Sequence, residues 1–166
     1  MDAVEAEIFG WPLTVFDSKI ETDANFKLML EYVLQPENIA AVHFGLASHN
    51  LFDLAYTHVL AEERSISEGL VFEMLDGKAD HVRRALKEEK QKGGSKEINL
   101  LLYTPVTSRD QFISAISYLV RRLDENTSPD NFLRHSFDLR VGSVAWKFLE
   151  KQFFEAWQLK DKIPSE

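Results

Sequence analysis

The chain has 166 residues, of which 45% are hydrophobic and 28% charged, which is typical of one globular domain that buries a core. Its net charge of −8 at pH 7 argues against nucleic acid or an anionic membrane surface as a partner, because both select a basic face. The absence of cysteine excludes disulfides, thiolate nucleophiles and zinc–thiolate sites. With an acidic amino terminus and no bilayer-length apolar run, we expect a cytoplasmic protein.

Short apolar runs of strand length alternate with helical patterns along the chain. The predicted strands occupy residues 39–46, 70–75 and 98–103. The predicted helices occupy residues 22–34, 51–63, 78–90, 109–125, 129–133 and 144–160. A strand followed by a helix every thirty residues or so predicts an α/β fold with a parallel sheet. Because the strands read as continuous apolar runs, we expect helices to cover both faces of the sheet.

Hydroxyl and amide side chains mark the predicted starts of several helices. The predicted N-caps are Thr22, Asn50, Ser128 and Ser143. Ser108 and Gln111 have the spacing of a capping box, in which the hydroxyl accepts a backbone N–H and the amide side chain reaches back. These signals fix where helices are expected to begin, but not what they pack against.

In parallel α/β folds, chemistry takes place at the carboxyl ends of the strands. Here those ends carry Ser48, His49 and Asn50 after the first strand, Leu75 on the second and Tyr103 on the third. Taken alone, His49 is more often structural and Leu75 more often a core residue. No histidines have ligand spacing, so we assign no metal, and no glycine-rich fingerprint for a nucleotide is present.

The helix predicted at residues 109–125 carries a charged face. Tyr118, Arg121, Arg122 and Glu125 are three or four residues apart and therefore lie on one side. A pair of guanidiniums suits an anionic ligand, because each can bind a carboxylate with two parallel hydrogen bonds, and Glu125 can hold one arginine in place. By itself, however, an arginine pair on a helix is more often a solvated face.

Taken in order, these motifs closely resemble the flavin-dependent proline dehydrogenases, in the form found in bacterial bifunctional proline utilisation A proteins. The most specific motif is Tyr-Leu-Val-Arg-Arg-x-x-Glu-Asn, which residues 118–126 match. The other matching segments are residues 18–19, 47–50, 72–77, 103–106 and 127–134. The resemblance extends over nearly the whole chain, and the order of the motifs makes coincidence improbable.

The resemblance implies a distorted (βα)₈ barrel that binds FAD and oxidises L-proline to Δ¹-pyrroline-5-carboxylate by hydride transfer to the flavin. By position, it implies that Arg121 and Arg122 grip the proline carboxylate, that Glu125 orients them, and that Tyr103 and Leu75 form walls against the proline ring. The implied FAD contacts are Lys19, Ser48, His49 and Asn50. Ser48 stands where family members often have threonine, so the hydroxyl is kept.

The match implies the last three strands of the family barrel, six to eight, with residues 1–166 as a single segment from the C-terminal portion of the barrel domain. The resemblance further implies an electron acceptor such as a membrane quinone, and a possible aldehyde dehydrogenase domain in the parent protein. Three strands cannot close an eight-stranded barrel. We therefore expect the isolated chain to be inactive, to bind FAD weakly or not at all, and to form a homo-oligomer that covers its open sheet.

Two other interpretations stay open from the sequence. The chain could be a non-catalytic half-barrel that acts as an interaction or ligand-binding module. It could also be a complete small α/β domain with an unrelated anionic ligand, although this interpretation leaves the ordered motifs unexplained.

Overall fold

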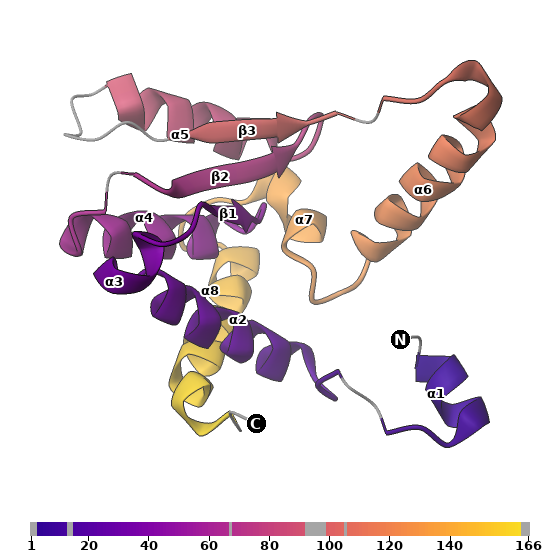
Figure 1. Ribbon diagram of the computed structural model, residues 1–166, viewed down its shortest axis with the longest axis horizontal. Helices are drawn as coiled ribbons and strands as arrows, with labels where there is room; N and C mark the ends of the chain where they lie inside the picture. Colours follow the sequence, from indigo (N-terminus) through magenta and orange to yellow (C-terminus); the bar gives the residue numbers. More distant parts are fainter. Residues whose placement is uncertain (1–2, 13–14, 67, 92–98, 105, 164–166) are drawn as a thin grey trace.

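The computed structural model describes residues 3–12, 15–66, 68–91, 99–104 and 106–163. It has an α/β fold built on a parallel sheet with the strand order β1-β2-β3 (Figure 1). The strands are β1 (Phe44–Ala47), β2 (Leu70–Leu75) and β3 (Leu100–Tyr103). The alternation of strands and helices and the parallel sheet were both predicted, and β2 has the predicted bounds.

Helices precede, connect and follow the strands. They are α1 (Ala3–Phe9), α2 (Lys19–Val33), α3 (Pro36–Ile39), α4 (Leu51–Glu63), α5 (Asp80–Gln91), α6 (Phe112–Glu125), α7 (Phe132–His135) and α8 (Val144–Leu159), with short 3₁₀ helices η1 (Arg109–Gln111), η2 (Ser136–Asp138) and η3 (Lys160–Lys162). No helix in the described part of the chain combines the length and apolar character needed to cross a bilayer.

The core lies on one face of the sheet. Burial alternates along β2 from one residue to the next, so that Phe72 and Met74 pack with side chains from α2, α4 and α5. The opposite face is open, and Leu101 and Tyr103 on it are 44% and 48% exposed. The prediction that helices cover both faces is therefore wrong, because apolar runs in these short strands do not reveal how many layers surround them.

The first strand begins later than predicted. Residues 39–43 precede β1 instead of forming part of it, and Ile39 closes the short helix α3. Pro36 occupies the first turn of α3, where its fixed φ and missing N–H favour a helix start. Ile39 is still buried, but as a helical residue in the core cluster. The predicted start of the third strand, residue 98, lies outside the described residues.

Three predicted helix caps differ from the structure. Helix α2 begins at Lys19, with Ser18 and Glu21 forming a capping box, so Thr22 is not its cap. Ser108 makes no side-chain capping hydrogen bond at the start of η1, so the predicted capping box with Gln111 does not form. The predicted helix at 129–133 is also shifted: Asn131, rather than Ser128, caps α7. In each case two nearby polar residues could cap the helix, and the sequence alone does not show which of them does.

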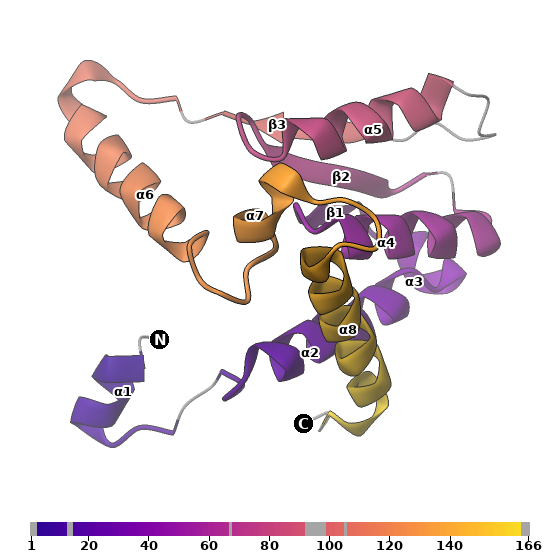
Figure 2. The same ribbon diagram turned by 180° about the vertical axis from the view of Figure 1, so that it is seen from behind.

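The predicted caps of α4 and α8 are confirmed. The Asn50 side chain accepts the backbone N–H of Phe52, and the Ser143 hydroxyl accepts that of Trp146. Helix α8 packs along α2 and touches α4, forming an outer layer against the core helices. Helix α6 instead stands apart from the sheet, as Figure 2 shows from behind.

Candidate active site

The carboxyl ends of the three strands meet at one edge of the sheet. The register pairs Ala47 with Glu73 and Leu75 with Tyr103, so the segments that follow the strands leave from the same edge. This edge therefore brings residues 48–50, Leu75 and Tyr103 close together, as the sequence predicted.

His49 links the ends of β1 and β2. Its Nε2 accepts the backbone N–H of Leu75 at 3.0 Å, which requires a neutral ring with its proton on Nδ1. Burial lowers the pKa of His49 from its ordinary value, and the positive charge of Lys78 lowers it further, so the neutral form is favoured. His49 thus holds the backbone at Leu75 and keeps an N–H donor at Nδ1.

Ser48 and Asn50 shape the turn from β1 into α4. The Ser48 hydroxyl accepts the backbone N–H of Asn50 at 3.1 Å, and Asn50 Oδ1 accepts that of Phe52 at 3.1 Å. In both side chains, an oxygen atom therefore already accepts a hydrogen bond from the backbone. The Ser48 O–H and the Asn50 side-chain N–H groups are the donors that a ligand would meet.

Lys19 approaches the same turn from α2. It is the first residue of that helix, its side chain is 40% exposed, and it forms an ion pair with Asp23 one turn later. The first turns of α2 and residues 47–50 line a cavity of about 340 Å³. The four predicted cofactor contacts therefore line one cavity: Lys19, Ser48, His49 and Asn50.

The chemistry around this cavity suits an anionic group. Its wall combines an ammonium with hydroxyl, amide and imidazole donors, and the N-terminal turns of α2 and α4 both contribute to it. Helix N-termini present unsatisfied N–H groups and a positive dipole end. Asp23 and Asp53 also line the cavity, but each is paired with a lysine. The donor set therefore fits an anionic group such as a phosphate.

A buried ion pair supports the wall of this cavity. Lys27 on α2 is 1% exposed, and its Nζ lies 3.0 Å from Oδ1 of Asp53 on α4. The same ammonium lies 4.6 Å from the ring centroid of Phe153 on α8, so the pair joins three helices. Burial raises the pKa of Asp53, and the charge of Lys27 opposes that rise.

The sequence analysis missed Lys27 and Asp53, because charged residues on amphipathic helices are usually exposed. The available signal was spacing: Lys27 lies three residues from both Ala24 and Leu30, which are buried. Residue type was less informative on this helix, since the apolar side chain of Met29 is 59% exposed.

Leu75 and Tyr103 lie side by side on the open face of the sheet. A tyrosine phenol is neutral at physiological pH, and the negative charge of Glu73 raises the pKa of Tyr103 above its ordinary value. Glu73 was not among the predicted site residues. Its position two residues before Leu75, and hence on the same face of the strand, was the signal that could have identified it.

The arginine-bearing helix α6 is separated from the strand ends in both views (Figure 1, Figure 2). Apolar residues at helical spacing form a stripe along α6, and this stripe is exposed: Phe112, Ile116, Leu119 and Leu123 are 57%, 44%, 43% and 60% accessible. Tyr118 and Arg121 are also exposed, whereas the side chains of Arg122 and Glu125 lie outside the described residues. Among the described residues, Asn126, just beyond the end of α6, lines the 340 Å³ cavity, whereas Arg121 does not.

A wider and mostly apolar cavity of about 840 Å³ adjoins the first. It lies between the turn after β2 with the start of α5, including Lys78 and His81, and the segment after α6, including Phe137. Asn126 and Leu133 line both cavities. The space at the carboxyl edge of the sheet is thus larger than the four predicted cofactor contacts alone indicate.

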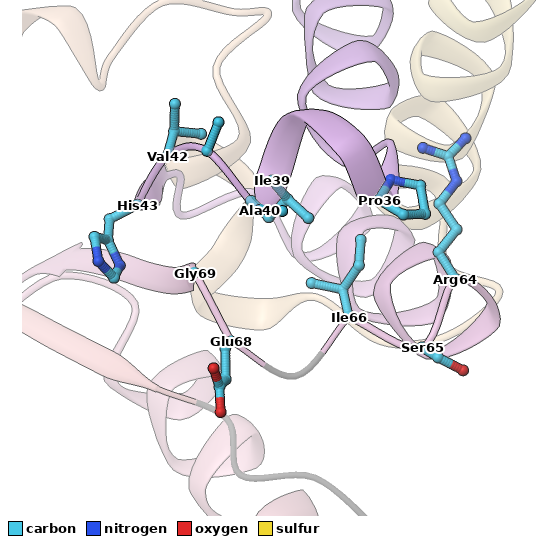
Figure 3. A pocket seen from close by; sticks show the side chains of 11 residues that line it. Pro36, Ile39, Ala40, Val42, His43, Arg64, Ser65, Ile66, Glu68 and Gly69 are labelled. Atoms are coloured by element: carbon cyan, nitrogen blue, oxygen red, sulfur yellow. The ribbon is translucent and has the colours of Figure 1, made fainter.

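A third cavity, of about 470 Å³, lies at the opposite end of the strands (Figure 3). His43 and Gly69, which immediately precede β1 and β2, line it together with α3. Arg64 also lines it, but donates to the backbone carbonyl of Glu31 at 2.7 Å. Because it lies at the amino ends of the strands, this cavity is separate from the candidate active site.

Comparison with known proteins gives consistent matches. The family model described as proline dehydrogenase matches residues 1–135. Proline utilization A from Corynebacterium freiburgense is similar in structure, with a TM-score of 0.75 and 35% identity over 98% of this chain. Proline utilization A from Bdellovibrio bacteriovorus, inactivated by N-propargylglycine, has a TM-score of 0.70 and 36% identity over 88%. The chain spans 14% of the length of each. No curated protein matches it.

Proposed function

Because the chain belongs to the proline dehydrogenase family, of the proline utilization A type, we propose that it is part of an FAD-dependent barrel that oxidises L-proline to Δ¹-pyrroline-5-carboxylate. Residues 1–166 act as a single segment that supplies strands six to eight of that barrel. The observation that carries this proposal is the cavity at the carboxyl edge of the sheet, where Lys19, Ser48, His49 and Asn50 converge.

In this proposal the cavity holds part of FAD, which, when bound, accepts the hydride that leaves proline. Lys19 and the turn after β1 supply donors to the anionic part of the cofactor. For Lys19 this means exchanging its contact with Asp23 for the ligand. His49 donates from Nδ1 while its Nε2 keeps the backbone N–H of Leu75, so one side chain couples the cofactor site to the substrate wall.

In this proposal, α6 and the open face of the sheet bind the substrate. Arg121 and Arg122 bind the proline carboxylate, and Glu125 orients them. Leu75 and the neutral phenol of Tyr103 form walls against the proline ring. Because α6 stands apart from the sheet here, these two groups must be brought to opposite sides of one ligand, which requires the rest of the barrel.

We therefore propose that the chain alone does not oxidise proline. A barrel site takes its groups from several strand ends, and a ligand must be largely enclosed to bind well. The open face of the sheet, with Leu101 and Tyr103 partly exposed, encloses one side of a ligand at most. A second copy covering this face would produce the homo-oligomer that we expect.

A segment exchange tests the proposal. Residues 1–166 replace the corresponding segment of proline utilization A from Corynebacterium freiburgense, and the purified chimera is assayed for visible flavin absorbance and proline-dependent dye reduction. A chimera with bound flavin and turnover supports the proposal. A chimera that folds and binds flavin but does not turn over proline contradicts it.

The remaining proposals concern the parent protein. We propose a membrane quinone as electron acceptor, an aldehyde dehydrogenase domain in the same polypeptide, and a cytoplasmic location. Assaying the chimera with a quinone in place of the dye tests the first of these. No nucleic-acid partner is proposed, given the net charge of −8.

A non-catalytic interaction module is the second candidate, and the exposed apolar stripe of α6 favours it. Such a stripe is typical of a surface that another protein covers. The same segment exchange separates the candidates, because an interaction module has no reason to retain a complete set of substrate and cofactor contacts. An active chimera excludes this candidate.

A further inference from the structure

Gly45, Glu73 and Tyr103 come from three different strands but share the open face of the sheet. The register places Ala47 beside Glu73, and Glu73 beside Leu101. Side chains two residues apart point to the same side of a strand. Gly45 therefore lies on the same side as Glu73, which in turn lies on the same side as Tyr103.

Glu73 occupies the space above Gly45. A Cβ atom built on Gly45 would lie 2.1 Å from Oε1 of Glu73 and 2.5 Å from its Cδ, far closer than van der Waals contact. The backbone of Gly45 has no positive φ, so conformational freedom does not explain the glycine. The absence of a side chain gives the Glu73 carboxylate its place over β1.

On its other side, Glu73 meets Tyr103 across β2 and β3. Glu73 pairs with Leu101, so Tyr103, two residues further along β3 on the same face, is its diagonal neighbour and lies within reach of a long side chain. Tyr103 is 48% exposed, so packing by itself leaves the ring considerable freedom. A hydrogen bond donated by the phenol to the Glu73 carboxylate would restrict that freedom and define where the hydroxyl lies.

We propose that Glu73 is a positioning residue for Tyr103: its carboxylate lies over the bare Cα of Gly45 and anchors the phenol at the substrate wall. The use of Tyr103 as a wall against the proline ring rests on the proposed function, whereas the coupling of the three residues does not. Glu73 acts through Tyr103 and is not assigned a contact with substrate.

The charge of Glu73 makes the coupling measurable. A carboxylate next to a phenol disfavours the phenolate, and it raises the pKa of Tyr103. Glu73→Gln keeps the shape and the possibility of a hydrogen bond but removes the charge. The pKa of Tyr103 should therefore fall in this variant, which a general loss of structure would not produce selectively.

The experiment is a pH titration of the full chain labelled with ¹³C at the tyrosine Cζ, followed by NMR, with Tyr103→Phe used to assign the signal. Asp76→Asn is the matched control, because it removes a carboxylate immediately after β2 without touching Glu73. A lower Tyr103 pKa in Glu73→Gln and an unchanged one in Asp76→Asn supports the proposal. An unchanged pKa in Glu73→Gln, or an equal fall in both variants, overturns it.

Gly45→Ala provides a second, steric test. Its methyl group takes the place of the Glu73 carboxylate, so the Tyr103 pKa should change in the wild-type background. In the Glu73→Gln background the same substitution should have little effect, because no charge is displaced. An equal effect of Gly45→Ala in both backgrounds overturns the proposed role of the glycine.

The positioning role itself is tested in the chimera described above. Glu73→Gln should raise the KM for proline by roughly three- to tenfold with a smaller effect on kcat, because a displaced wall weakens binding. An unchanged KM in an active chimera overturns the positioning role. An inactive wild-type chimera instead contradicts the proposed function, and the titration still decides the coupling.

Discussion

Replacing Lys27 with methionine should destabilise the fold by about 3–5 kcal/mol at pH 7, because it leaves a buried carboxylate without its partner. Lys27 and Asp53 are 1% and 8% exposed, and 3.0 Å separates their charged atoms, so the Asp53 carboxylate has little contact with water to replace the lost one. Methionine retains most of the apolar stem and leaves little cavity. Since a single domain has about 5–15 kcal/mol of stability in total, the expected loss is a large fraction.

The cost should depend on pH. Burial raises the pKa of Asp53, and Lys27 opposes this, so the pKa rises further when Lys27 is removed. A carboxyl whose pKa is higher in the folded state binds more protons there than in the unfolded state. Stability then falls as the pH increases from the unfolded pKa to the folded one. The destabilisation caused by Lys27→Met should thus be largest near neutrality and shrink toward the ordinary aspartate range.

Urea unfolding followed by circular dichroism at a fixed protein concentration measures these effects. Lys19→Met is the matched control, because it breaks a lysine–aspartate pair on the same helix whose side chains are 40% and 26% exposed, and it should cost about 0–1 kcal/mol. The double variant Lys27→Met/Asp53→Asn should be more stable than the sum of the single changes predicts. Equal costs for Lys27→Met and Lys19→Met would refute the reasoning.

The remaining predictions concern the site, a helix cap and assembly. In the active chimera, Arg121→Ala or Arg122→Ala should raise the KM for proline more than tenfold, as expected when a charge-assisted partner worth about 2–5 kcal/mol is lost, with the flavin spectrum intact; wild-type KM values would contradict the assignment. Glu125→Gln should weaken proline binding less than either arginine change in the same assay. Asn50→Ala should cost about 1 kcal/mol in urea unfolding, because α4 loses its cap; no loss would mean that the cap is dispensable. Light scattering on the chain alone should show oligomers, and a monomer with bound flavin would contradict our account of the open sheet.

Much of the fold could be predicted because its signals are local. Asn50 caps α4 and Ser143 caps α8 as expected, since each provides a side-chain oxygen immediately before a helical pattern. The ends of β2 were also predicted correctly. Its residues are apolar except for Glu73, and Gly69 and Asp76 stand immediately before and after them. The convergence of residues 48–50 with Leu75 and Tyr103 followed from the rule that parallel strands end at one edge.

Features that depend on tertiary packing could not be predicted in this way. The apolar residues that begin at residue 39 are compatible with a strand or with the end of a short helix. Pro36 favours the helix, because proline fits its first turn. Charged residues such as Lys27 become buried only when a partner on another helix compensates them. The exposure of the apolar stripe on α6 has the same origin, because periodicity identifies an apolar side but not whether anything covers it.

The open sheet links the stability of this segment to the site that we propose. Glu73, Leu75 and Tyr103 lie on the face that the helices leave uncovered, so whatever buries that face also encloses the substrate wall. A ligand that binds only the covered state must stabilise it in proportion to RT ln(1 + [L]/Kd). FAD or a proline analogue should therefore promote closure of the proposed barrel around this segment. If the closed state is unstable, the affinity for FAD and for the proline analogue should be lower. On this argument, the exposed apolar residues and the one-sided substrate wall that we propose both follow from the open face of the sheet.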